Sequence, residues 1–130
     1  IGISERILRK GSFLTKKEYS LIRMHPQIAV DILRPIQILH EIIPLIYYHH
    51  ERWDGSGYPT GLAGNSIPIG ARIIALADVY QALISDRPYR KRMCHEDALK
   101  VIRDGAGKQF DPMIVDKFLK ILPKHPKFSL

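Results

Sequence analysis

The sequence predicts an all-α fold: a helical bundle that carries one long, ordered, glycine-rich loop. Apolar residues recur at helical spacing along most of the 130 residues, and alternating strand patterns are few. Prolines and small polar residues also stand where helices would begin, which is their usual place. At this length we expect a single domain, 1–130, whose patternless last residues, 123–130, fray.

The first two helices are predicted from their boundary residues. Thr15 and Glu18 have the spacing of a capping box, so a helix is expected over 16–24. Pro26 follows directly, and proline suits the first turn of a helix because it has no amide hydrogen to leave unpaired. Pro35 then ends this second helix.

A third helical region is expected over 36–50, with Pro44 either kinking or restarting it. The next segment, 51–68, is rich in glycine and contains two prolines, so we expect a long loop. Loops of this length inside a compact domain are usually functional or disordered. The apolar side chains of Trp53, Tyr58 and Leu62 favour an ordered loop.

The second half of the chain returns to helical spacing. A strongly apolar helix is predicted over 70–84, and a basic turn at 86–92 leads into a helix near 96–103. Asp111 followed by Pro112 is typical of a helix start, which predicts a last helix ending near Leu122.

Composition restricts the classes of function. Twenty basic and thirteen acidic residues give a net charge of +7, which suits an anionic partner such as a nucleotide, nucleic acid or phospholipid, or simply solubility. A single cysteine, Cys94, excludes an internal disulfide and a cysteine-based zinc site, so a reducing cytoplasm is predicted. No apolar run approaches the length of a membrane span, and the first residues lack a signal-peptide pattern.

Histidines and one aspartate are the candidate metal ligands. His49 and His50 end an apolar helix, where neighbouring side chains point about 100° apart, so they are expected to reach two neighbouring ions, one each. Both could equally be ordinary helix-end residues. Asp78 has no basic residue three or four positions away, which favours either a metal ion or a distant ion pair. His25, at a helix break, is either a ligand or a polar core or surface residue.

The loop and the basic turn are the candidate ligand-binding segments. Glycines in the loop allow a ligand to approach the backbone closely, and Trp53 and Tyr58 could either stack on a base or anchor the loop. The basic turn at 86–92 contains arginines, which suit a phosphate or a guanine edge. Basic runs are often merely solvated, so we expect two of its four cations to take part.

Three stretches together resemble the HD-GYP domain family, which comprises metal-dependent phosphodiesterases that hydrolyse cyclic di-GMP. They are KGSFLTKKEYSLIRMHPQIAVDIL, then HHERWDGSGYPTGLAGNSIPIGARIIALADVYQALISDRPYRKR, and finally GAGKQFDPMIVDKFL. The resemblance covers about 1–122. It lies in the adjacent histidines, the glycine-rich loop, the ALAD helix and the DRPYR turn, which occur in the family's order.

The resemblance implies a site and a reaction. Matching positions imply metal ligands at His25, His49, His50 and Asp78. They imply substrate-binding residues at Gly57, Tyr58, Pro59, Arg87 and Arg90. The family carries two or three divalent ions, often iron or manganese, and yields a linear dinucleotide or GMP. Its signalling role also implies a possible signalling-protein partner. Neither a nucleic-acid duplex nor a membrane span is expected.

Two departures from the family pattern bear on activity. The family's His-Asp pair would fall just before Ile1, so the chain is expected to be the C-terminal portion of such a domain and to have little activity by itself. Gln81 stands where many relatives carry an aspartate. The alternative function is a non-catalytic module that senses a cyclic dinucleotide or docks a signalling partner. A basic nucleic-acid-binding helical domain is a weaker alternative, since no helix-turn-helix spacing is present.

Overall fold

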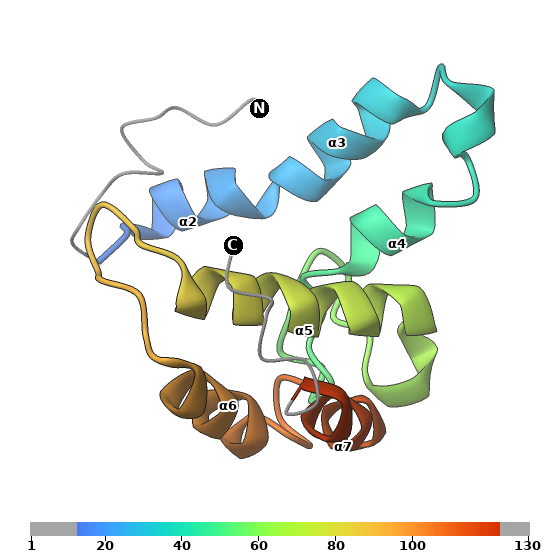
Figure 1. Cartoon of the computed structure of the whole chain (residues 1–130). Helices are drawn as coiled ribbons and strands as arrows, with labels where there is room; N and C mark the ends of the chain where they lie inside the picture. Colours follow the sequence, from blue (N-terminus) through green and yellow to red (C-terminus); the bar gives the residue numbers. More distant parts are fainter. Residues whose placement is uncertain (1–12, 123–130) are drawn as a thin grey trace.

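The computed structural model describes residues 13–122, and within this range the chain is helical with no extended strand. Six α-helices, labelled α2 to α7 in Figure 1, are joined by turns, two short 3₁₀ helices and one long loop. The all-α prediction is confirmed. The predicted frayed tail at 123–130 lies outside the described residues. None of the described helices is long and apolar enough to cross a bilayer.

The first two helices follow one another almost in line (Figure 1). In α2, Lys16–Arg23, the capping box is formed: the backbone amide of Thr15 donates to the Glu18 carboxylate at 2.8 Å, and the amide of Glu18 donates to the Thr15 hydroxyl at 3.2 Å. Met24 caps α2, and α3, His25–Leu33, begins at once with proline in its first turn. His25 is therefore fixed at a junction between two helices.

The third predicted region is two elements rather than one. A 3₁₀ helix, Gln37–Leu39, is followed by α4, Ile43–Tyr48, which has Pro44 in its first turn. Proline thus restarts the helix here instead of kinking it. His49 is the C-terminal cap of α4, so the two adjacent histidines stand where the helix gives way to the loop.

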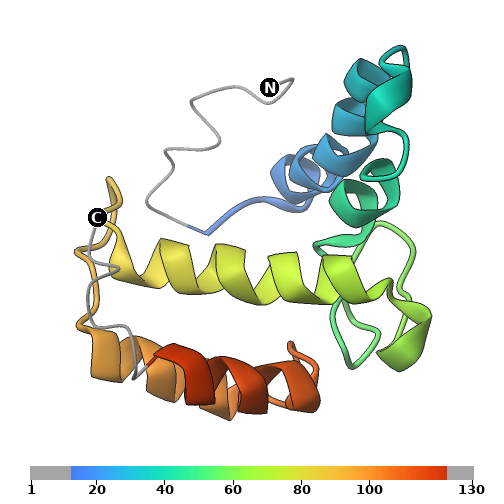
Figure 2. The ribbon, with the colours of Figure 1, turned by 45° about the vertical axis from the view of Figure 1, so that its right-hand side comes forward.

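The longest helix, α5, Ile69–Ile84, runs through the middle of the molecule (Figures 1 and 2). Helices α2, α3 and α4 lie on one side of it, and α6, His95–Asp104, and α7, Pro112–Ile121, lie on the other. The loop 51–68, which contains a 3₁₀ helix at Gly64–Ser66, connects α4 to α5. The histidines therefore precede the loop, and the long helix follows it.

The main core lies between α5, α6 and α7. Its buried members are Leu76, Ile102, Phe110 and Val115. Close packing extends to Gly105, where a Cβ atom would come within 2.7 Å of the Phe110 ring. Elsewhere on α5, Ile69 and Ile73 are 55% and 51% exposed.

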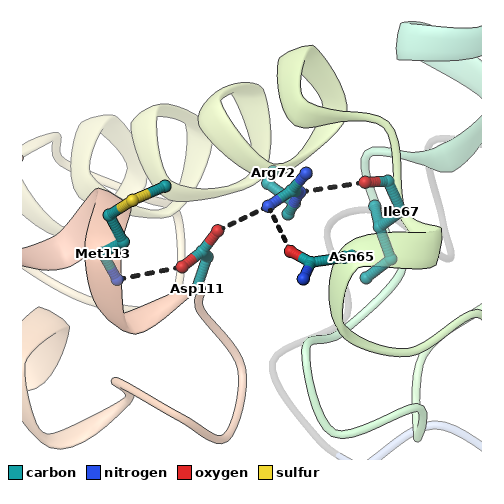
Figure 3. Close-up of polar contacts among 5 residues, drawn as sticks. All are labelled: Asn65, Ile67, Arg72, Asp111 and Met113. Atoms are coloured by element: carbon teal, nitrogen blue, oxygen red, sulfur yellow. Dashed lines mark hydrogen bonds and ion pairs between the residues drawn. The ribbon is translucent and has the colours of Figure 1, made fainter.

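A buried ion pair ties the loop, α5 and α7 together (Figure 3). The Arg72 guanidinium lies 2.7 Å from the Asp111 carboxylate, with only 11% and 3% of the two side chains exposed. Arg72 also donates to the backbone oxygen of Ile67 at 2.9 Å and to the side-chain oxygen of Asn65 at 3.3 Å. Asp111 in turn accepts from the amide of Met113, which makes it the predicted helix cap.

The first part of the loop is anchored to the turn before α7. The amides of Trp53 and Asp54 donate to the backbone oxygens of Gln109 and Lys108 at 3.2 and 2.8 Å. The Arg72 guanidinium lies 5.9 Å from the centre of the Trp53 ring, within the range of a cation–π contact. Trp53 therefore anchors the loop, which was one of its two predicted roles. The loop is ordered because both of its ends are held.

Candidate metal centre

Three histidines from two helix ends converge at one place. His25 begins α3, His49 caps α4, and His50 follows it. Each can offer one ring nitrogen such that the three nitrogen atoms lie within 4.8 Å of one another. The ring centres of His49 and His50 are 4.0 Å apart, and that of His25 lies 4.5 Å from His50. This spacing suits three ligands of a single metal ion.

Two of these rings are oriented by the helix ends that carry them. The Nδ1 atom of His25 lies 2.6 Å from the backbone oxygen of Ile22, and that of His49 lies 2.6 Å from the oxygen of Ile46. A carbonyl oxygen only accepts, so each Nδ1 must carry the hydrogen and donate it. The lone pair of each neutral ring is then on Nε2. Metal-binding histidines are typically oriented by such a bond from the other ring nitrogen.

His50 is held in the neutral form that a metal ligand needs. Burial, and then the neighbouring His49 and His25, lower the pKa of His50 from 6.5 to about 3. The ring of Tyr58 stacks on it, with centres 5.0 Å apart and planes only 11° from parallel. At neutral pH the His50 ring therefore carries no proton that would compete with a metal ion.

His49 and His50 both lie in one cluster, and their expected binding of two neighbouring ions, one each, stays a prediction. The 100° offset between neighbours holds only inside a helix. Because α4 ends at Tyr48, the backbone at His50 already belongs to a turn, and both rings come to the same cluster.

The glycine of the Gly57-Tyr58-Pro59 segment is required by a close backbone approach. A Cβ atom at Gly57 would lie 2.4 Å from the amide nitrogen of Arg52 and 2.6 Å from the backbone oxygen of His50. The next amide, that of Tyr58, donates to the same His50 oxygen at 3.3 Å. The loop thus folds back onto the backbone that follows the histidine pair, and this places the Tyr58 ring on His50.

A buried glutamate, which no sequence motif indicated, closes this loop. Glu51 is only 3% exposed, and its carboxylate accepts from the amide of Thr60 at 2.7 Å and from the amide of Gly61 at 3.0 Å. These bonds join the residue after the histidine pair to the residues just beyond Pro59. The sole sequence signal was its position beside two histidines, since a glutamate in a loop is ordinarily solvated.

Asp78 lies near the cluster but outside the three-histidine group. It stands on α5 with its side chain exposed, so no burial cost obliges it to have a partner. Burial first, and then neighbouring charges that include Asp78, raise the pKa of Tyr58 to about 12. The role of Asp78 as a metal ligand stays a prediction.

The basic turn is ordered largely by its second arginine. The Arg90 guanidinium donates to the backbone oxygens of Ala82, Leu83 and Lys91 at 2.8 to 3.3 Å, which satisfies carbonyls at the end of α5. The backbones of Arg87 and Arg90 bond to each other in both directions, and the Arg87 side chain is exposed. Among residues 13–122, the Arg87 side chain forms no hydrogen bond and no ion pair with the loop. The substrate-binding roles of both arginines stay predictions.

Helix-end histidines gathered beside a closed glycine-rich loop, within an all-helical fold, define a helical domain with a candidate metal centre. Residues 2–114 match the family model described as HD domain, and the chain belongs to the HD domain family. HD domains bind divalent metal ions, and the three-histidine cluster is a place where such an ion fits.

Similar proteins agree with this assignment. The chain is 42% identical, over 92% of its length, to a probable cyclic di-GMP phosphodiesterase from Vibrio cholerae, of which it covers 29%. It is 43% identical, over 93% of its length, to a cyclic di-GMP phosphodiesterase from Thermotoga maritima, of which it covers 33%. The chain thus spans about a third of the length of the curated relatives it matches. The interpretation as an HD-GYP-type domain is confirmed.

A solved structure shows the same fold. It is the crystal structure of a cyclic GMP-AMP specific phosphodiesterase from V. cholerae, with a TM-score of 0.69 and 24% sequence identity. The match covers 95% of this chain and 32% of the other.

Proposed function

We propose that this chain contributes the histidine cluster and the substrate-facing loop of a metal-dependent phosphodiesterase. The substrate is a cyclic dinucleotide, cyclic di-GMP first of all, and the product is the linear dinucleotide or GMP. One observation carries the proposal: three histidines converge beside a tyrosine that the loop stacks on one of them. The similar proteins named as cyclic di-GMP and 3'3'-cGAMP phosphodiesterases support this substrate class.

The proposed ligands are His25, His49, His50 and Asp78, with iron or manganese as the expected metal. An all nitrogen and oxygen set without a thiolate suits these ions. A divalent ion held there supplies Lewis-acid polarisation of a phosphoryl oxygen and a nucleophile at neutral pH. The chain's own contribution is to keep the His50 ring neutral and, through the Nδ1–H bonds of His25 and His49, to leave their Nε2 atoms available as ligands. The exposed Asp78 carboxylate adds negative charge from the side of α5.

The substrate-binding part of the proposal rests on Gly57, Tyr58, Pro59, Arg87 and Arg90. Tyr58 keeps its hydroxyl proton at neutral pH and can donate it to a phosphate oxygen, since its pKa is raised to about 12. Arg87 is exposed and free of ion pairs among residues 13–122, and Arg90 supports the turn that carries it. The net charge of +7 also favours an anionic ligand.

Residues 1–130 are proposed to act as one domain, the C-terminal portion of an HD-GYP domain. A cytoplasmic location is supported by the single, free and exposed Cys94. The family resemblance alone supports a signalling-protein partner.

The test is cyclic di-GMP turnover by the natural full-length protein supplied with manganese or iron, followed by chromatography of the products. His49→Ala should lower the rate on the order of a hundredfold or more, since loss even of a group that orients a ligand costs about 10–100-fold. His40→Ala is the matched control, because His40 is exposed and bonds to the backbone oxygen of Arg34.

Full turnover by His49→Ala would contradict the proposal. Binding of cyclic di-GMP without any hydrolysis by the wild type would instead favour a non-catalytic sensor. For the 130-residue chain by itself we expect little turnover, because four protein ligands hold two neighbouring ions incompletely.

A further inference from the structure

An arginine on α2 lies beside the candidate site and belongs neither to the histidine cluster nor to the loop 51–68. The guanidinium carbon of Arg23 lies 5.6 Å from the ring centre of Tyr58 and 5.8 Å from that of Tyr19. Both distances are within the range of cation–π contacts. The rings of Tyr19 and Tyr58 themselves meet edge to face, 6.4 Å apart. Arg23 thus belongs to a small cation–aromatic group next to the histidines.

This group borders the metal centre through Tyr58. The Tyr58 ring stacks on His50 and also lies 6.2 Å from the ring of His25.

The stability of α2 explains only in part why an arginine stands at position 23. Arg23 is in the last turn of α2, where a cation is favoured by the helix dipole. That effect requires no particular direction of the side chain. Arg23 is exposed, and no ion pair to it is formed among residues 13–122, so its charge is not neutralised by the described part of the protein. A guanidinium fixed over two rings keeps its donors available to a ligand.

We propose that Arg23 binds the part of the cyclic dinucleotide that extends beyond the scissile phosphodiester, through its second phosphate group. This rests on the function proposed above. A cyclic dinucleotide has two phosphodiesters, and only one can occupy the histidine centre at a time. Arg23 contacts the Tyr58 ring, and that ring also contacts His50 in the histidine cluster. Guanidinium–phosphate pairs are charge-assisted and often bidentate. Tyr19 and Tyr58 hold the guanidinium in place.

The experiment compares two substrates in the manganese-loaded, natural full-length protein. Cyclic di-GMP has the second phosphate, whereas bis(p-nitrophenyl) phosphate is a small phosphodiester that needs only the metal centre. R23Q should raise the KM for cyclic di-GMP about tenfold or more, the effect of one lost charge-assisted hydrogen bond. It should leave turnover of the small substrate and the manganese content unchanged. R23K, which keeps the charge without the planar fork, should give an intermediate KM.

Lys17→Gln is the matched control, because Lys17 is an exposed cation at the other end of the same helix. If R23Q and K17Q have the same KM for cyclic di-GMP, Arg23 does not bind the substrate. If R23Q loses manganese or slows both substrates alike, it acts on the folded centre, and the proposal is equally overturned. A wild type that hydrolyses the small phosphodiester but neither binds nor hydrolyses cyclic dinucleotides would refute the proposed function itself.

Discussion

Replacing the buried glutamate of the loop, Glu51, should destabilise the protein more than replacing an exposed glutamate would. In Glu51→Ala the amides of Thr60 and Gly61 lose a charged acceptor, each bond being worth about 1.5–3 kcal/mol. Removing the carboxylate also removes its own desolvation cost, which offsets part of this loss. We expect the free energy of unfolding to fall by about 3 kcal/mol, or the Tm by about 10 °C.

Urea and thermal unfolding followed by circular dichroism would measure this. Glu51→Gln should cost less, about 1–2 kcal/mol, because an amide oxygen still accepts while its NH₂ group faces a backbone donor. Glu41→Ala is the control, since Glu41 is exposed and a surface change of this kind stays within about 0.5 kcal/mol. Equal stability of the Glu51 and Glu41 variants would show that the carboxylate does not hold the loop closed.

Three further changes test other parts of the structure. Gly57→Ala forces a Cβ atom against backbone 2.4 Å away, so it should displace the loop and cost several kcal/mol, about 2–4, in unfolding free energy; a loss under about 0.5 kcal/mol would contradict the close approach. Arg72→Ala leaves a buried carboxylate unpaired and should cost about 3–5 kcal/mol, whereas Lys120→Ala, which breaks an exposed pair, should cost at most about 1 kcal/mol; similar losses would refute the difference. His49→Ala should abolish the tight binding of one manganese ion in calorimetry and His40→Ala should not; undiminished binding by the first would place the ion elsewhere.

The sequence was sufficient for most helices because their ends carry local signals. Thr15 and Glu18 form the expected capping box, and Asp111 caps the last helix as predicted. Pro44 left two possibilities open, since the same residue can kink a helix or begin one. Only the packing of α4 against its neighbours decides between them.

The convergence of His25 with His49 and His50 was expected from the family motif and not from local spacing. Helical geometry alone predicted that the adjacent pair would diverge, because it took no account of the helix ending at Tyr48. The ring orientations follow from bonds to carbonyls three residues earlier, and such bonds depend on the side-chain conformation.

Long-range partners were beyond the reach of sequence reasoning. Glu51 bonds to amides nine and ten residues away, and Arg72 pairs with Asp111 from 39 residues away. Nothing in the sequence distinguishes these charges from solvated ones. Arg90 is a similar case, because its bonds to the end of α5 need the turn at 86–92 to fold back on the helix.

The central claim is that one metal ion is held by ring nitrogens of His25, His49 and His50, with Nε2 as the ligand atom of His25 and His49. Crystals of the protein soaked with zinc as a probe ion, with data collected at the zinc absorption edge, test it directly. The account predicts an anomalous peak about 2.0–2.1 Å from the Nε2 atoms of His25 and His49 and from one ring nitrogen of His50, with both Nδ1 bonds to the carbonyls intact. A peak on Nδ1 of His25 or His49, or none among the three rings, would contradict it.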